Sequence, residues 1–89
     1  MSISKGQIEK AITLAKEYGA TRLLLFGSAL ENPNQANDLD LACDGIVGWK
    51  LYELGAELEE ILGVELDIIP LTPANRFTRF IESKAKVLI

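Results

Sequence analysis

Two aspartates stand one residue apart in a short alternating segment, DLDLAC, at positions 38–43. In an extended strand successive side chains point to opposite faces, so Asp38 and Asp40 share one face while Leu39 and Leu41 share the other. Two carboxylates on one face of an apolar strand repel each other and lose hydration, which destabilises the fold unless a positive charge lies between them. A divalent cation supplies that charge, so the spacing indicates a metal site.

A third carboxylate, Asp67, lies inside another apolar segment, VELDII, at positions 64–69. It completes the site if the two strands are neighbours in the sheet. Carboxylate oxygens without a histidine favour Mg²⁺, with Mn²⁺ as the alternative ion, and disfavour zinc. We therefore expect Asp38, Asp40 and Asp67 to be both the metal ligands and the catalytic residues.

Gly27 and Ser28 follow the apolar segment RLLLF, at positions 22–26. A glycine lets a phosphate approach the backbone, and a serine hydroxyl with the free N–H groups of a helix start donates hydrogen bonds to an anion. Phosphate donors beside carboxylates indicate a metal-bridged nucleotide, in which two ions stabilise the attacking and the leaving oxygen.

An acid-x-acid pair alone is a weak signal, because the chain contains three such pairs. They are Asp38/Asp40, Glu57/Glu59 and Glu65/Asp67. The order of the parts is more specific: an apolar strand ending in Gly-Ser, a polar loop, Asp-Leu-Asp-Leu, and a later apolar strand with an acid. The competing interpretation is a structural α/β domain whose aspartates lie on a solvated strand edge.

The ordered set resembles the minimal nucleotidyltransferases (MNT) of the DNA polymerase β superfamily. The matching motifs are Phe26-Gly27-Ser28, Asp38-Leu39-Asp40-Leu41 and Leu66-Asp67-Ile68, and the resemblance extends over nearly the whole chain. It implies a palm-like nucleotidyltransferase fold in which the first two acids bind both metals, the third faces the attacking hydroxyl, and Gly-Ser holds the triphosphate.

The chain departs from the family pattern at two places. Ala29 follows Gly-Ser where members often carry a basic residue, and Asn37 precedes the first aspartate where a serine is common. The first departure leaves other basic residues as candidates for neutralising the triphosphate. These candidates are Arg22, Lys50, Arg76 and Arg79.

The resemblance also implies a partner. MNT proteins of this size are commonly paired with a helical HEPN-domain toxin and act as its antitoxin by transferring AMP from ATP to it. We therefore expect an Mg²⁺-dependent nucleotidyltransferase, specifically a protein adenylyltransferase, with ATP as substrate and two metal ions. The alternative is an antitoxin with a weak or vestigial site that neutralises its partner by binding alone.

The remaining pattern predicts the elements that position these residues. We expect helices over 4–18, 47–62 and from Thr72-Pro73 to about Lys84, a helical turn from Ser28, and strands over 22–26, 38–43 and 64–69. This is an α/β (α+β) arrangement: a small mixed sheet of about three strands with helices packed on it, in an order that the pattern leaves open. Helical spacing favours core packing over base stacking for four aromatic residues: Trp49, Tyr52, Phe77 and Phe80.

Composition narrows the function classes. The 89 residues predict one domain, 1–89, and the net charge of −4 with scattered basic residues disfavours nucleic-acid binding. The single cysteine and the absence of an apolar signal or membrane-spanning segment predict a cytoplasmic protein. A hydrophobic content of 48% is high for so small a chain, which indicates a protein partner or a homodimer.

Overall fold

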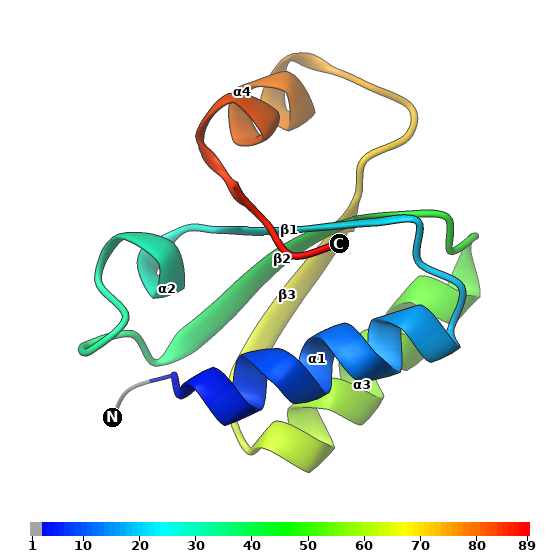
Figure 1. The fold of residues 1–89 in the computed structure, drawn as a ribbon. Coiled ribbons are helices and arrows are strands. Elements are labelled where there is room, and N and C mark those ends of the chain that lie inside the picture. The colour runs from blue at the N-terminus through cyan, green and yellow to red at the C-terminus, as the bar shows by residue number, and fades with distance from the viewer. Residues whose placement is uncertain (1–2) are drawn as a thin grey trace.

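The computed structural model describes residues 3–89, and in this range helices and strands alternate along the chain (Figure 1). The elements are α1 (Lys5–Glu17), β1 (Arg22–Phe26), α2 (Ser28–Glu31), β2 (Asp38–Asp44), α3 (Trp49–Leu62), β3 (Glu65–Pro70), α4 (Arg76–Lys84) and β4 (Lys86–Val87). The predicted α/β class and most of the predicted segments are confirmed. Ser4 caps α1 in a capping box with Gln7, as the spacing predicts.

The strands form one mixed sheet in the order β3-β2-β1-β4. β2 runs parallel to β3, and β1 is antiparallel to both of its neighbours, β2 and β4. The prediction of about three strands was one short. The fourth strand, β4, has two residues, both exposed, and such a short segment carries no alternating pattern that a sequence could reveal.

Helices α1 and α3 lie side by side on one face of the sheet (Figure 1). The strand residues that point to this face form the larger hydrophobic core with the two helices. Leu54 and Leu58 of α3 are fully buried there, and each contributes about 1.5–3 kcal/mol relative to an exposed side chain. This core fixes which side of each strand faces inward, and therefore sends the aspartates of β2 to the opposite face.

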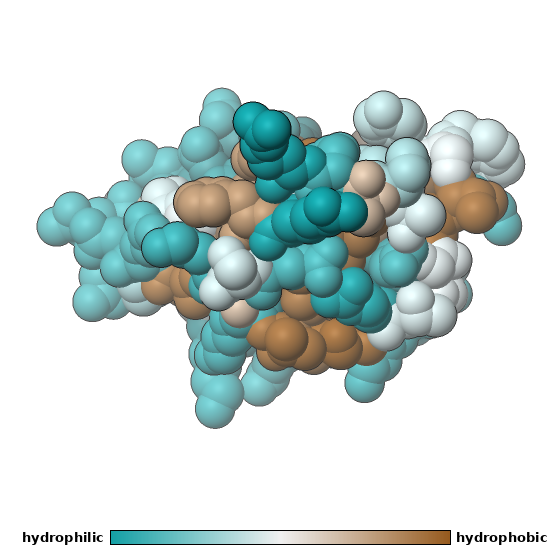
Figure 2. All heavy atoms as spheres, turned by 90° about the horizontal axis from the view of Figure 1, so that it is seen from above, coloured by the Kyte–Doolittle hydropathy of each residue, from teal (hydrophilic) through white to brown (hydrophobic). Residues whose placement is uncertain are grey.

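Helix α4 covers part of that opposite face (Figure 1). A small second hydrophobic cluster lies between α4 and the sheet, in which Leu24 and Ala42 from the strands pack against Leu71 and Ile81. Figure 2 looks down on the α4 side and shows hydrophobic surface broken up by hydrophilic groups. The second core is small, so α4 leaves the remainder of this face uncovered.

Two helix boundaries differ from the prediction. The third helix begins at Trp49 rather than near 47, and Val47 is 76% exposed instead of packing in the core. The last helix begins at Arg76, where the side chain of Asn75 accepts a hydrogen bond from the backbone N–H of Thr78, so the prediction of Thr72 as its N-cap was wrong. Asn75 is also a favoured capping residue, and it stands closer to the apolar positions of the helix.

The prediction that the four aromatic residues are packing residues was also wrong. Trp49, Tyr52, Phe77 and Phe80 are between 56% and 76% exposed. In α4 the buried positions are Thr78 and Ile81, and Phe77 lies at the border of this face, since its ring contacts that of Phe26 but remains 56% exposed. Cys43 is buried at 1% exposure, as its strand position predicts. In the described residues no helix is long and apolar enough to cross a membrane.

Candidate functional site

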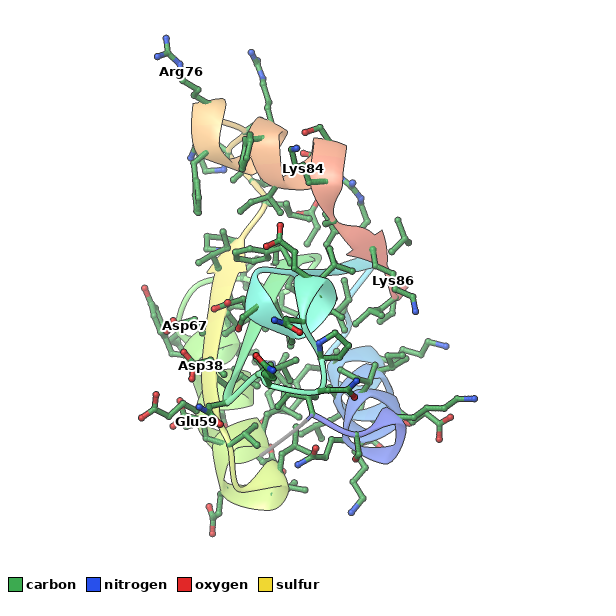
Figure 3. The ribbon with its side chains drawn as sticks, turned by 90° about the vertical axis from the view of Figure 1, so that its left-hand side faces the viewer. Asp38, Glu59, Asp67, Arg76, Lys84 and Lys86 are labelled. Carbon is green, nitrogen blue, oxygen red and sulfur yellow. The ribbon has the colours of Figure 1, made fainter. Side chains whose placement is uncertain are left out.

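The parallel pairing of β2 with β3 sets the candidate carboxylates side by side. Asp40 is the register partner of Asp67, and Asp38 is the partner of Glu65. Neighbouring strands lie about 4.8 Å apart, and paired residues point to the same face. Figure 3 shows Asp38 and Asp67 close together beside β3, where both line one hollow. The structure therefore places all three aspartates at neighbouring positions on the face that α4 covers only in part.

The three carboxylates differ in their surroundings. Asp38 and Asp67 are exposed, whereas Asp40 is half-buried between the strands on either side. Burial raises the pKa of Asp40 above its ordinary value, and the negative charges of Asp67 and Asp38 raise it further. The ionised form of Asp40 is therefore less favourable than that of an exposed aspartate, and a nearby positive charge would offset this difference.

Gly27 lies directly against Asp40. β1 and β2 pair so that Phe26, the residue before Gly27, faces Asp40. Gly27 has φ 74° and ψ −154°, a conformation that is essentially restricted to glycine. A Cβ at this position would collide with Oδ2 of Asp40. The glycine thus brings bare backbone up to the half-buried carboxylate.

Ser28 begins the four-residue helix α2 and is exposed. The carbonyl oxygen of Gly27 accepts hydrogen bonds from the N–H groups of Leu30 and Glu31. The first N–H groups of a helix have no partner within the helix, so those of Ser28 and Ala29 are available to an anion. The Gly-Ser junction consequently presents donors next to Asp40.

The chain matches no family profile and no curated protein, but it is similar to several solved structures. One is the toxin–antitoxin pair MntA–HepT, with TM-score 0.75 and 20% identity over 97% of this chain and 72% of that chain. Another is a toxin–antitoxin with AMP-PNP, with TM-score 0.78 and 22% identity over 92% of this chain and 72% of that chain.

A third is the complex of a tri-AMPylated HEPN toxin from Shewanella oneidensis with its MNT antitoxin. It matches with TM-score 0.77 and 19% identity over 98% of this chain and 72% of that chain. This chain has the minimal nucleotidyltransferase fold. At these identities the likeness establishes the fold, and the predicted resemblance to MNT antitoxins is confirmed at that level.

The donor chemistry of the MNT-fold site suits Mg²⁺, because the three side chains offer hard carboxylate oxygens and crowd negative charge around Asp40. Within residues 3–89, however, no three acidic, histidine or cysteine side chains already converge in the arrangement of a metal site. Asp38, Asp40 and Asp67 are neighbours in the sheet, and their side chains would have to turn toward one another to enclose an ion.

Two glutamates border the site. The alternation of the strand predicts Glu65 on the same face as Asp67, as a solvated neighbour or an extra ligand, whereas sequence reasoning did not place Glu59 there. Asp38 and Asp67 line a surface hollow of about 290 Å³ together with Glu59 and Glu65. Glu59 comes from α3, and its Oε1 accepts a hydrogen bond from the backbone N–H of Leu66 at 3.2 Å (Figure 3). Glu59 therefore binds the backbone of β3 through this hydrogen bond. The sequence could not reveal this contact, because the helical repeat of α3 does not indicate which strand lies beside Glu59.

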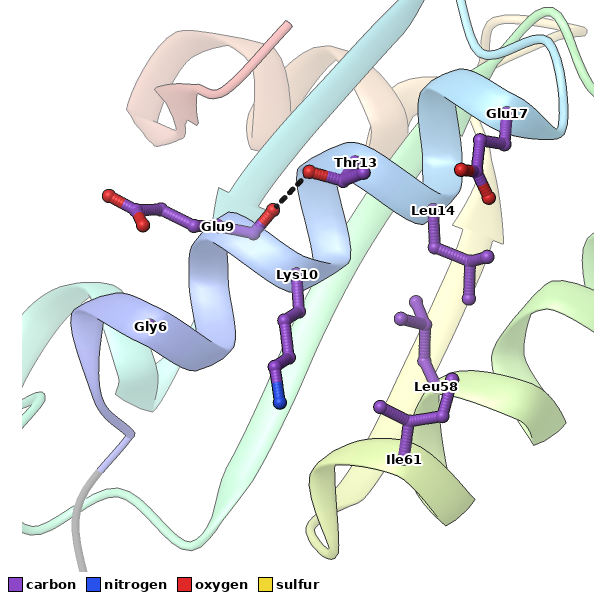
Figure 4. A pocket seen from close by; sticks show the side chains of 8 residues that line it. All are labelled: Gly6, Glu9, Lys10, Thr13, Leu14, Glu17, Leu58 and Ile61. Atoms are coloured by element: carbon purple, nitrogen blue, oxygen red, sulfur yellow. Dashed lines mark hydrogen bonds between the residues drawn. The ribbon is translucent and has the colours of Figure 1, made fainter.

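A second hollow lies elsewhere, between α1 and α3 (Figure 4). It has a volume of about 530 Å³, and Leu14, Leu58 and Ile61 point toward one another across it. The one hydroxyl that lines it, on Thr13, donates its hydrogen bond to the carbonyl oxygen of Glu9 at 3.0 Å. This groove lies in the helical layer, and none of the candidate site residues lines it.

Proposed function

We propose that this chain is an Mg²⁺-dependent nucleotidyltransferase that acts as an antitoxin by transferring AMP from ATP to a hydroxyl of a HEPN-type toxin. The observation that carries the proposal is the pairing of Asp40 with Asp67 across β2 and β3, with the backbone of Gly27 against Asp40. The fold is shared with a toxin–antitoxin with AMP-PNP and with an MNT antitoxin bound to a tri-AMPylated toxin.

Each residue has a distinct role in this proposal. Asp38 and Asp40 hold two Mg²⁺ ions, and Asp67 completes the site on the side of the incoming hydroxyl. Bound Mg²⁺ supplies positive charge that offsets the triphosphate. Gly27 and Ser28 donate hydrogen bonds to the phosphates and fix their position.

The transfer is balanced without any further reactant. The acceptor oxygen forms a bond to the α-phosphorus, the bond from that phosphorus to the bridging oxygen breaks, and pyrophosphate leaves. The proton of the acceptor hydroxyl passes to the carboxylate of Asp67, which is exposed and therefore accessible to an acceptor on another chain. Most of the rate enhancement comes from positioning and from charge compensation.

A second candidate function is an antitoxin that neutralises the toxin by binding alone. One sequence observation favours it: Ala29 stands where the family often has a basic residue. The exposed aromatic residues of α3 and α4 give such an antitoxin apolar surface for contact.

The test is the intact mass of the protein encoded beside this one after co-expression. With the wild type we expect a gain of one or more AMP groups, and with Asp38→Ala/Asp40→Ala we expect none. A matched double variant, Glu53→Ala/Glu60→Ala, removes two exposed acids of α3 and keeps the gain. A stable complex with no mass gain for the wild type refutes transfer and supports binding alone.

A further inference from the structure

We propose that Lys84, at the end of α4, supplies the positive charge for the triphosphate that the segment after Gly27-Ser28 lacks. This inference rests on the proposed nucleotidyltransferase function and extends it to a residue far along the chain from the motif. Ala29 and Leu30 follow Ser28, so α2 itself brings no cation to the phosphates.

The path of the chain carries Lys84 toward the Gly-Ser junction. β4 is antiparallel to β1, with Leu24 facing Val87 and Leu25 facing Lys86. Counting backwards from Lys86 in this antiparallel register, the residues that precede β4 lie beside Phe26 and Gly27. Ala85 packs against the same small cluster as Phe26, and Lys84 immediately precedes it. Lys84 thus lies at the Gly27 end of β1.

Lys84 shares a flank of α4 with Phe77, which contacts the strand residue paired with Asp40. Phe77 stands seven residues earlier on α4, which is two turns and the same flank. Its ring packs edge-on against that of Phe26 at 6.4 Å, and Phe26 is the register partner of Asp40. In Figure 3 Lys84 lies on the side of the molecule turned to the viewer, which is the side of α2.

The ammonium group of Lys84 is available for a ligand. Its Nζ lies 5.8 Å from the centre of the Phe80 ring, a contact that leaves the charge at the surface. Among the residues that the structure describes, Lys84 takes part in no ion pair. An ammonium held on an aromatic ring, without a carboxylate, remains free to bind an anion.

The other basic candidates are placed less well. Arg22 forms an ion pair with Glu82 at 3.2 Å. Arg79 stands one turn before Glu82 and therefore lies on the flank of α4 that carries Glu82. Lys50 lies over Trp49 at the start of α3, at the opposite end of the sheet from Gly27.

The two remaining cations near α4 also point elsewhere. Arg76 extends away from the body of the molecule in Figure 3. Lys86 pairs with Leu25, so it points to the face of the sheet that α1 covers. Lys86 lines a hollow with Ala29 and Leu30 on that face. Of the cations around α4, Lys84 is therefore the one that the register of β4 places at the Gly27 end of β1 on the face of the aspartates.

The experiment measures binding to the full chain in the presence of Mg²⁺, with ATP, inorganic tripolyphosphate and AMP as separate probes. The variant Lys84→Met keeps the aliphatic stem and removes the charge. We expect it to weaken ATP and tripolyphosphate by about tenfold each, the size of one charge-assisted hydrogen bond, and to leave AMP unchanged. Lys84→Arg retains most of the affinity for both polyphosphates.

The matched control is Lys86→Met, which removes the same charge from an exposed position two residues away. We expect it to leave the affinity for ATP within about twofold, because its ammonium lies across the sheet. Equal losses for the two variants, or no loss for Lys84→Met, overturn the inference while the wild type still binds ATP. A wild type that binds neither ATP nor tripolyphosphate refutes the proposed nucleotidyltransferase function itself.

Discussion

Substitution of Gly27 by alanine tests the closest contact of the candidate site. Two effects add: the backbone at φ 74° and ψ −154° costs a residue with a Cβ about 1–3 kcal/mol, and the new Cβ collides with the carboxylate of Asp40. Pushing that side chain off its rotamer costs a further 0.5–1.5 kcal/mol, roughly. The smaller freedom of alanine in the unfolded chain returns about 0.4–1 kcal/mol.

The sum is a loss of about 2 kcal/mol in the free energy of unfolding. For a domain of this size that lowers the melting temperature by about 8–16 °C. The matched control is Gly48→Ala, at φ 50° with no atom within 4 Å of the place that a Cβ would take, so it has the backbone cost without the collision. We expect Gly48→Ala to cost about 1 kcal/mol less than Gly27→Ala.

A double-mutant cycle isolates the collision. In Gly27→Ala/Asp40→Ala the carboxylate is gone and the nearest atom of residue 40 is its Cβ, at 3.3 Å. The coupling measured by chemical denaturation should be about 1 kcal/mol. Equal destabilisation by Gly27→Ala and Gly48→Ala, together with additivity in the cycle, would show that Gly27 does not press against Asp40.

Two further predictions concern ionisation. Because the pKa of Asp40 is raised in the folded chain, the free energy of unfolding falls as pH rises above 3.8 in the absence of divalent ions. The variant Asp40→Asn removes this contribution of residue 40 to the fall. Mg²⁺ should raise the melting temperature of the wild type but not that of Asp40→Asn. An Mg²⁺ effect of equal size in both proteins would contradict the metal assignment. Burial raises the pKa of Cys43 from 9.0 to about 11, so stability falls between those pH values as the unfolded thiol ionises first, and Cys43→Ala makes this fall smaller. The same thiol should resist a disulfide reagent at about pH 8 until the protein unfolds, and rapid native-state reaction would contradict its burial.

The strands were predictable because their two kinds of pattern have direct physical causes. β1 is a continuous apolar run since residues 23–25 are buried on both faces, and β2 alternates since only one of its faces meets α1 and α3. β4 was not predictable. It owes its existence to the backbone of β1, with which Val87 and Lys86 pair, and its own side chains are exposed.

The aromatic residues show where periodicity stops being informative. Helical spacing tells which residues share a face, but the neighbouring element decides which face is buried. In α4 the buried residues are Thr78 and Ile81. The hydroxyl of Thr78 also accepts a hydrogen bond from the backbone N–H of Asn75 in the capping box. Phe80 and more than half of Phe77 are therefore exposed, although their hydrophobicity alone favours the core.

The candidate site combines predictable and unpredictable parts for the same reason. Asp38 and Asp40 share a face by local geometry, so their proximity follows from the sequence. That Asp67 lies beside Asp40 depends on β2 and β3 being parallel neighbours, which a strand–helix–strand unit permits but does not require.

The proposed positive side chain for the triphosphate is the part of the site that depends most on residues far apart in the sequence. Asp40 is half-buried with two further negative charges beside it, so a polyphosphate can approach only with metal ions and with a positive side chain from elsewhere. No residue next to Gly27-Ser28 is basic, and the edge strand β4 returns the end of α4 to this point. The short pairing of β4 with β1, which has no counterpart in the sequence pattern, is therefore what connects Lys84 to the motif. A variant that breaks this pairing, such as Val87→Pro, should weaken tripolyphosphate binding as Lys84→Met does, even though Val87 itself carries no charge.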